Sequence, residues 1–243
     1  MYRNIHTYDI RYTDVDFKDE LKLSSLLSVL EESACYSADE LGFGYDDISP
    51  KGIGFILANW YIELYRPIKL KEKLTVHTWP RTPKNTIFIR DFELYSGKEK
   101  VGVGTTRWCM VDLATFSILP TSAFFGDGTN RGYNDTHAVE FNSWRILPLK
   151  DGEKKYEKYV SYSDYDHYNH VNNTKYADMC LDAFSVQELE NKHLEKVLIT
   201  YVKQCKYGEL IEFYRADEGN TSVIEGRVDG EPRVRVKFTF SER

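Results

Sequence analysis

The chain has 243 residues, of which 42% are hydrophobic and 29% are charged, and its formal net charge at pH 7 is −6. This length allows one large domain or two small ones, and either arrangement can bury a core. The acidic balance argues against non-specific binding to nucleic acids, which requires a basic surface.

The N-terminal stretch and the cysteines indicate a cytoplasmic protein. The stretch MYRNIHTYDIRY lacks the apolar core of a signal peptide and the Arg- and Ser-rich composition of a transit peptide. No apolar run approaches the roughly 20 residues that span a bilayer. The four cysteines lie far apart without a CxxC pair, which is more typical of reduced intracellular thiols than of disulfides or a zinc site. We therefore expect no membrane span.

The first predicted elements are a helix and four strands. After the segment YTDVD (residues 12–16), apolar residues recur at helical spacing on one face: Leu23, Leu26, Leu27, Leu30 and Ala34. Beyond this helix the apolar period changes from 3.6 to 2, which predicts strands. We place these strands at residues 59–65, 74–79, 86–95 and 101–112.

A stretch rich in Gly, Asn and Lys then separates two halves of the chain. It contains FFGDGTNRGYNDTH and LPLKDGEKKYEK, whose compositions are typical of a linker. We take residues 1–125 as an N-terminal unit and residues 126–157 as the linker. Residues 158–243 form a C-terminal unit that carries the candidate site described below.

The second half repeats the first. YSDYD at residues 162–166 matches YTDVD 150 positions earlier, and a helical pattern again follows in matching phase, with Tyr176, Met179, Cys180 and Ala183. Strands are predicted at residues 197–205, 209–214, 221–228 and 233–240. Each half is thus a helix followed by an antiparallel sheet, a duplicated α+β unit. Because one helix cannot cover a whole sheet face, we expect the halves to join edge to edge or face to face. Two independent domains on a flexible linker are the alternative.

The segment YSDYDHYNHVNN, residues 162–173, is the candidate site. It offers four potential metal ligands, namely Asp164, Asp166, His167 and His170. The two histidines lie three residues apart where a turn meets a helix, so their directions need not converge. A second interpretation is that the Asn and Asp side chains only cap the helix. Capping alone does not explain why His170 stands where the first half has Glu20.

A third interpretation is an acid/base site at the start of a helix. Backbone N–H groups at a helix N-terminus carry partial positive charge and can stabilise an oxyanion. Asp166 could act as general base on water or attack directly, His170 could orient that carboxylate or share a proton, and Asn169 could fix the geometry. A thioester is a suitable substrate for such a site, because its leaving group, a thiol with a pKa of about 8.5, departs without strong protonation.

Four stretches of the chain resemble the plant and bacterial acyl-acyl-carrier-protein (acyl-ACP) thioesterases. They are residues 8–34, 78–120, 162–184 and 198–209, so the resemblance spans nearly the whole chain. It implies an α+β double hotdog fold, in which a curved antiparallel sheet wraps a long helix twice per chain. It also implies hydrolysis of fatty acyl-ACP in fatty acid biosynthesis, of the oleoyl or palmitoyl type, with no metal and no organic cofactor.

The resemblance also assigns site residues. The family's segment reads Asp, any residue, Asn, any residue, His, Val, Asn. Asp166, His170, Val171 and Asn172 match it, whereas Tyr168 stands at the first asparagine position and Asn169 comes one place later. The resemblance implies Asp166 as base or nucleophile with His170 as its partner. Backbone N–H groups near Val171 and Asn172 would polarise the carbonyl, and the Tyr168 hydroxyl or Asn169 would replace the missing amide.

A second position departs from the family. Plant members have Glu followed by Cys on a strand, and this chain has Gln204 followed by Cys205. Gln204 cannot act as a base but could position water. Cys205 is either the nucleophile of a papain-like scheme or a small residue on a buried strand. Residues 59–65 and the apolar helix faces would line an acyl tunnel.

The partner that the resemblance implies is acyl carrier protein with a fatty acyl chain on its phosphopantetheine. Because that protein is acidic, a basic docking face is expected. Two sets of side chains could supply it: Arg66, Lys69, Lys71 and Lys73, or Arg81, Lys84 and Arg90. An acyl-coenzyme A thioesterase of the same fold and a non-hydrolytic acyl- or carrier-binding module are the alternatives. The sequence leaves open whether the protein forms a homodimer.

Overall fold

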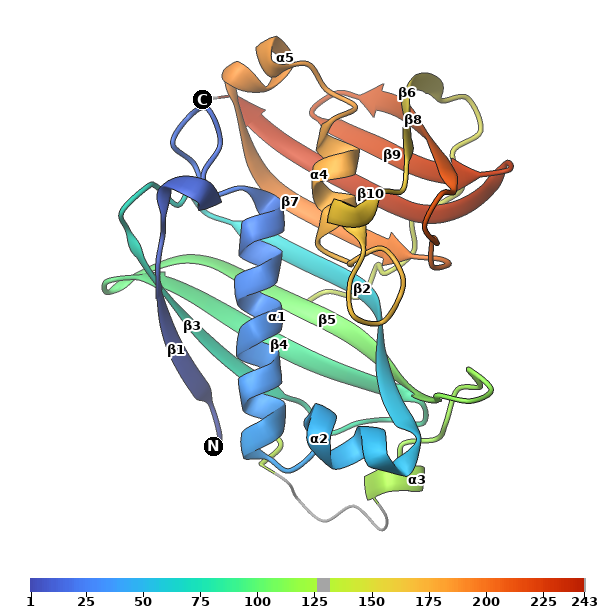
Figure 1. The fold of residues 1–243 in the computed structure, drawn as a ribbon. Helices are drawn as coiled ribbons and strands as arrows, with labels where there is room; N and C mark the ends of the chain where they lie inside the picture. The colour runs from blue at the N-terminus through green and yellow to red at the C-terminus, as the bar shows by residue number, and fades with distance from the viewer. Residues whose placement is uncertain (126–131, 243) are drawn as a thin grey trace.

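A single curved antiparallel sheet runs through both halves of the chain (Figure 1). The computed structural model describes residues 1–125 and 132–242, and in these residues ten strands follow the order β1-β3-β4-β5-β2-β7-β10-β9-β8-β6. The strands of the first half are β1 (Asn4–Asp9), β2 (Ile53–Leu64), β3 (Lys73–Pro80), β4 (Ile87–Ser96) and β5 (Glu99–Asp112). Those of the second half are β6 (Glu153–Tyr159), β7 (Lys192–Tyr201), β8 (Leu210–Glu218), β9 (Thr221–Val228) and β10 (Glu231–Glu242).

The two halves join edge to edge through β2 and β7. Residues 59–63 of β2 pair with residues 196–200 of β7, so that Trp60 lies opposite Ile199. Read inward from either edge of the sheet, the strand order is equivalent in the two halves. This arrangement confirms the predicted duplication and gives one continuous sheet rather than two separate ones.

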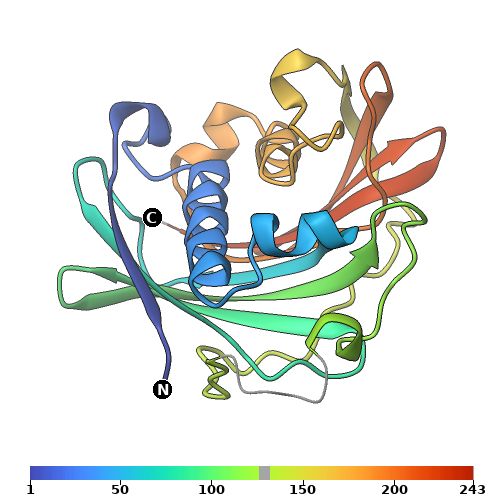
Figure 2. The same ribbon diagram turned by 60° about the horizontal axis from the view of Figure 1, so that its bottom comes forward.

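The long helix and most of the shorter ones lie on one face of this sheet (Figure 2). The long helix α1 (Leu23–Glu40) crosses the first half, and α4 (Lys175–Leu181) crosses the second and packs against α1. Shorter elements complete the set: α2 (Tyr45–Ile48), α3 (Ser122–Phe125), α5 (Val186–Glu190), and the 3-10 turns η1 (Tyr12–Asp14), η2 (Ser49–Lys51) and η3 (Tyr162–Asp164). The first half therefore has the long helix that the fold class predicts, whereas the helix of the second half has only 7 residues.

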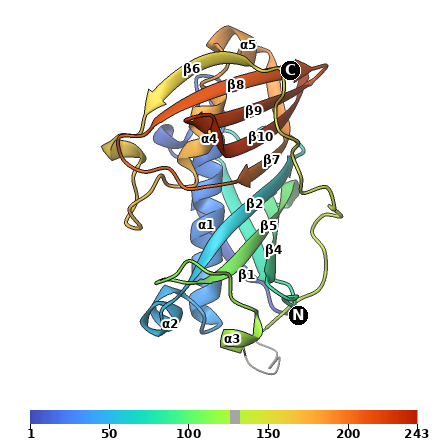
Figure 3. The ribbon, with the colours of Figure 1, turned by 90° about the vertical axis from the view of Figure 1, so that its right-hand side faces the viewer.

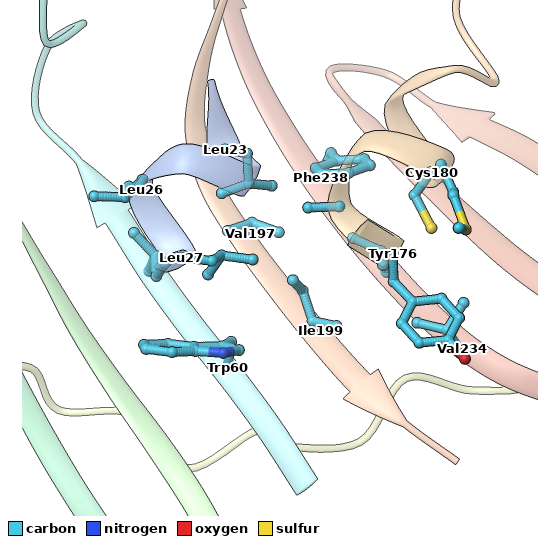
Figure 4. Close-up of a cluster of buried hydrophobic side chains, with 14 of the residues drawn as sticks. Leu23, Leu26, Leu27, Trp60, Tyr176, Cys180, Val197, Ile199, Val234 and Phe238 are labelled. Atoms are coloured by element: carbon cyan, nitrogen blue, oxygen red, sulfur yellow. The ribbon is translucent and has the colours of Figure 1, made fainter. Parts of the chain in front are cut away.

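The core lies between the helices and the sheet and belongs to both halves (Figure 4). Leu26, Leu27 and Leu30 of α1 are at most 1% exposed and belong to the same cluster as Tyr176 and Cys180 of α4. The strand residues of this cluster include Trp60, Val197, Ile199, Val234 and Phe238. The helical phase predicted from the sequence, with Leu26 equivalent to Tyr176 and Leu30 to Cys180, is confirmed.

Three local features differ from the sequence predictions. Strands β1 and β6 form the two edges of the sheet and were not predicted, because they are short and largely polar. Strand β6 includes residues 153–157, which the sequence assigned to the linker. Strand β7 begins at Lys192 and ends at Tyr201, so Gln204 and Cys205 follow the strand instead of lying on it.

The connection between the halves runs over the opposite face of the sheet (Figure 3). In this connection, the ring of Phe141 stacks on that of Tyr61 of β2 with 3.6 Å between the ring centroids. Ile146 of the same connection is buried in the same cluster. Residues 126–131 of the predicted linker lie outside the described residues. Among the helices in the described parts of the chain, none is long and apolar enough to cross a membrane.

Candidate active site

A tight hairpin between η3 and α4 presents the candidate residues. The backbone N–H of Asp166 donates to the carbonyl oxygen of His170 at 3.0 Å, and that of Asn169 donates to the carbonyl oxygen of Asp166 at 3.1 Å. Asn169 has a φ of 63°, the left-handed conformation that asparagine tolerates well and that closes a three-residue hairpin. The exposed Asn169 thus has a local structural role, which brings Asp166 and His170 to adjacent positions.

Asp166 and His170 face each other at this hairpin. Oδ2 of Asp166 lies 3.5 Å from Nδ1 of His170, and their side chains are 12% and 17% exposed. The other carboxylate oxygen, Oδ1, accepts the backbone N–H of Tyr168 at 2.9 Å. One oxygen is therefore held by the loop, and the other lies against the imidazole.

The second contact of His170 assigns its tautomer. Nδ1 lies 3.1 Å from the carbonyl oxygen of Val171, and a carbonyl oxygen can only accept a hydrogen bond. The hydrogen of a neutral ring therefore sits on Nδ1, between Val171 and Asp166. Nε2 then carries the lone pair and can accept a proton.

The structure corrects one expectation about the oxyanion site. The backbone N–H of Val171 donates to the carbonyl oxygen of Cys205 at 3.1 Å, and that of Asn172 donates to the carbonyl oxygen of Asp164 at 2.9 Å. Helix α4 begins only at Lys175, so these two N–H groups are not free helix donors. The side chain of Asn172 instead accepts from the backbone N–H and hydroxyl of Thr174 at 2.9 and 2.6 Å, a local capping role.

An aromatic group covers the outer side of the hairpin. Tyr168 is exposed, and its ring lies 3.8 Å from that of His167 and is nearly parallel to that of His170 at 6.0 Å. Tyr45 of α2 contacts both His167 and Tyr168 edge-on, at 6.1 Å in each case. Helix α2 belongs to the first half, so both halves contribute to the rim of the site.

Gln204 and Cys205 lie beside the hairpin in different environments. The exposed Gln204 precedes Cys205, whose side chain is fully buried in the core. Burial raises the pKa of the Cys205 thiol to about 11, so the thiol is protonated at neutral pH. The backbone N–H of Cys205 donates to the hydroxyl oxygen of Tyr176 at 3.2 Å. This environment is that of a packed structural thiol.

The environment of Cys205 gives a first prediction. Cys205→Ala is expected to leave kcat for thioester hydrolysis nearly unchanged and to lower the unfolding free energy by about 1 kcal/mol, because only a small buried group is lost. Steady-state kinetics and denaturant unfolding would measure both quantities. Loss of a nucleophile would instead lower kcat by several orders of magnitude, and that result would restore the papain-like scheme.

The remaining candidates of the segment are structural. Asp164 is buried, accepts from the backbone N–H and hydroxyl of Ser161 at 2.9 Å, and forms an ion pair with Lys158 at 2.9 Å. These contacts outweigh burial and lower the pKa of Asp164. Within residues 1–125 and 132–242, no group of three or more His, Cys, Asp or Glu side chains converges as a metal site would require.

The first half contains the same hairpin with different side chains. Asp16 donates its N–H to the carbonyl oxygen of Glu20 at 2.8 Å, and Asp19 has a φ of 58°, as at the equivalent Asn169. Here Lys18 replaces Tyr168 and Glu20 replaces His170. Nζ of Lys18 lies 3.3 Å from Glu20 and 3.9 Å from Asp16, so both carboxylates are neutralised by an ion pair.

A cavity of about 510 Å³ lies at this first hairpin. Its lining is mainly apolar and includes Phe17, Leu26, Leu64 and Leu181, with Asp16 and Lys18 also present. Asp166 and His170 do not line it. The expected lining of the acyl tunnel, residues 59–65 and the apolar helix faces, contributes Leu64 and Leu26 to this cavity, but the cavity lies at the pseudo-symmetric position and not beside Asp166.

Glu31 on α1 is a further residue near the site that the motif did not indicate. It is half-buried, and burial together with the negative charge of Asp166 raises the pKa of Glu31 to about 7. The sequence contained a signal for it, because Leu23, Leu27 and Glu31 follow one another at four-residue spacing on one helix face. A carboxylate on an otherwise apolar face calls for an explanation.

Comparisons with known proteins agree over the whole chain. Models of the acyl-ACP thioesterase N-terminal and C-terminal domains match residues 2–120 and 149–240. A comparison with curated protein sequences finds no significant match. Among solved structures, an acyl-ACP thioesterase from Bacteroides thetaiotaomicron VPI-5482 is 22% identical with a TM-score of 0.89, and 98% of each chain is covered.

Two further solved structures have the same architecture. A putative oleoyl thioesterase from Lactobacillus plantarum is 18% identical with a TM-score of 0.87 and covers 99% of this chain and 96% of its own. The 12:0-ACP thioesterase from Umbellularia californica is 16% identical with a TM-score of 0.89 and covers 99% of this chain and 98% of its own. The α+β double hotdog fold is therefore confirmed, and the chain belongs to the acyl-ACP thioesterase family.

Proposed function

We propose that the protein hydrolyses the thioester of fatty acyl-ACP, releasing free fatty acid and holo-ACP, and that Asp166 and His170 carry the reaction. One observation carries this proposal. In a chain of this family, a half-buried carboxylate and an imidazole lie 3.5 Å apart on a hairpin whose first-half counterpart has glutamate in place of the imidazole. The pair can accept and hold a proton, as acyl transfer to water requires.

The contacts of His170 support a role as the proton acceptor for water. With its hydrogen on Nδ1, the ring offers Nε2 to an attacking water molecule. The imidazolium that forms would be stabilised by the Asp166 carboxylate at Nδ1. Direct attack by Asp166 on the acyl carbonyl uses the same geometry, and we keep it as the second route. Neither route requires a metal ion or an organic cofactor.

The rim residues have subsidiary roles in this proposal. Tyr168 and Tyr45 form an aromatic edge beside the pair, where the pantetheine arm of the substrate would lie. Gln204 is exposed next to the hairpin and could position water through its amide. Asn169 acts through the backbone turn that it closes.

The docking face for acyl carrier protein needs one revision. Arg90 is only 6% exposed and donates to the hydroxyl of Ser37 at 2.8 Å, so it cannot contact a partner protein. Arg66 is engaged by Glu72 and Glu99. Lys73 is exposed but paired with Asp9 at 2.6 Å, so Lys71 and Lys84 remain the candidates for contact with the acidic carrier. A carrier-bound substrate also fits the cytoplasmic location that the cysteine spacing suggests.

A direct assay tests the proposal. The protein is incubated with oleoyl- and palmitoyl-ACP and with the corresponding acyl-coenzyme A esters, and free fatty acid and free thiol are measured. We expect release from the carrier-bound substrates at a higher kcat/KM, and we expect His170→Ala to abolish it. Preference for coenzyme A would favour the acyl-coenzyme A thioesterase. Binding without release from either substrate would favour the non-hydrolytic module.

A further inference from the structure

We infer that Glu31, on the helix of the N-terminal half, donates the proton to the departing thiolate at the site that Asp166 and His170 form in the C-terminal half. This inference rests on the function proposed above. It assigns a catalytic residue from one half of the chain to a hairpin of the other, so that the site is complete only when α1 packs against α4.

The position of Glu31 supports this assignment. Helix α1 packs against α4, and Glu31 lies within electrostatic range of Asp166 and Tyr168 in the hairpin and of Tyr201 on β7. Its side chain is half-buried. Among the described residues, Glu31 forms no hydrogen bond and no ion pair, so its carboxyl group is available to a ligand.

The pseudo-symmetry of the chain supplies an internal comparison. The 150-residue repeat places Leu181 of α4 at the position equivalent to Glu31. Leu181 and Asp16 line the same cavity at the first hairpin, just as Glu31 and Asp166 lie near each other at the second. The site at the first hairpin, which lacks the imidazole, thus has a leucine at the helix position where the second site has Glu31, although Asp178 of α4 and Asp182 also line its cavity.

The electrostatic environment sets the protonation state of Glu31. Burial is the main cause that raises the pKa of Glu31, and together with the negative charges of Asp166 in the hairpin and Glu32 on α1 it brings this pKa to about 7. Tyr168, Tyr201 and Cys35 also lie around it and carry no positive charge. A carboxyl group that holds its proton close to neutral pH can act as the general acid.

The proposed step balances as follows. The oxygen of water forms a bond to the acyl carbon, and the proton of that water passes to His170 or Asp166. The C–S bond then breaks and its electron pair goes to sulfur. The sulfur takes the proton of the Glu31 carboxyl group. The products are the fatty acid and the free pantetheine thiol. The proton held by the pair returns to Glu31 through solvent, which restores the starting state.

The experiment varies the leaving group. Wild type, Glu31→Gln and the neighbouring control Glu32→Gln are compared on S-dodecanoyl-N-acetylcysteamine, an alkyl thioester, and on the thioester of dodecanoic acid with p-nitrothiophenol. The arenethiolate leaves without protonation. We expect Glu31→Gln to lower kcat on the alkyl thioester by about 100-fold. We expect little change on the aryl thioester, and no change for Glu32→Gln on either.

The pH profile provides a second measurement. In wild type the donor is protonated below its pKa, so kcat on the alkyl thioester should fall as the pH rises through about 7. Glu31→Gln should lack this limb. Circular dichroism establishes that the variant is folded, and the isosteric amide preserves the size of the side chain.

The outcomes separate this inference from the proposed function. Equal losses on the two thioesters, or no loss on either, would overturn the role of Glu31. Activity that remains full in Glu31→Gln but disappears in His170→Ala would overturn only this inference. If wild type hydrolyses neither carrier-bound substrate nor the two model thioesters, both the proposed function and this inference fail.

Discussion

Asp166→Asn is expected to lower kcat for acyl-ACP hydrolysis by about 1,000-fold or more, since comparable carboxylate-to-amide changes beside a catalytic histidine cost up to about 10,000-fold. The amide keeps the size of the side chain and can still accept the backbone N–H of Tyr168, which holds Oδ1 at 2.9 Å. It removes the charge that faces Nδ1 of His170 and the only form of residue 166 that could attack or accept a proton. Single-turnover release of thiol from acyl-ACP measures the effect on the chemical step.

The chain offers a matched control for this substitution. Asp16 occupies the equivalent hairpin position. Its Oδ1 likewise accepts backbone N–H groups, from Lys18 at 2.8 Å and from Glu20 at 3.1 Å. Asp16→Asn should therefore change local structure as Asp166→Asn does, while kcat stays near the wild-type value. Similar losses in both variants would mean that Asp166 supports the fold, and the site assignment would be wrong.

The sequence predicted the two residues that face each other but not the rest of their environment. Asp166 and His170 are separated by one hairpin, so local turn chemistry is enough to place them together. Whether the backbone N–H groups of Val171 and Asn172 are free to bind a ligand depends on the carbonyl oxygens of Cys205 and Asp164, which accept them. One of these acceptors comes from a distant segment, and no spacing within the motif reveals it.

Glu31 shows the same limit more clearly. It lies 135 positions before Asp166 in the chain, and the two approach each other only because α1 and α4 pack side by side on one face of the sheet. The apolar face of α1 was visible in the sequence, and so was a charged residue on it. The periodicity could not predict which helix packs against α1 or which hairpin lies beside Glu31.

The fold could be predicted further than the site, for a physical reason. Central strands bury one face and therefore alternate in a way that the sequence displays, as in β10, where Val234, Val236, Phe238 and Phe240 are buried. Exposure also alternates along the edge strands β1 and β6, but several of their inward-facing positions are polar, such as Asn4, His6 and Lys158, so the sequence does not display the alternation as an apolar pattern. Only pairing with β3 and β8 defines them as strands.

Trp60→Ala is expected to lower the unfolding free energy by about 3–5 kcal/mol, as do other large-to-small changes in a core. Trp60 is 1% exposed on β2, at the joint with β7, and its ring lies 5.3 Å from that of Phe92. Because one core cluster contains residues of both halves, we expect the substitution to destabilise both halves. Denaturant unfolding followed by hydrogen exchange in each half would measure this, and we expect a single transition shifted to lower denaturant concentration.

The same experiment decides between one cooperative molecule and two domains on a linker. Tyr65→Ala, next to β2 and 56% exposed, is the matched aromatic control and should change the unfolding free energy by no more than about 0.5 kcal/mol. If Trp60→Ala shifted exchange only in the N-terminal half, with β9 and β10 unaffected, the halves would be independent. A site that takes Asp166 from one half and Glu31 from the other depends on the opposite result, because its geometry exists only while the β2–β7 joint is intact.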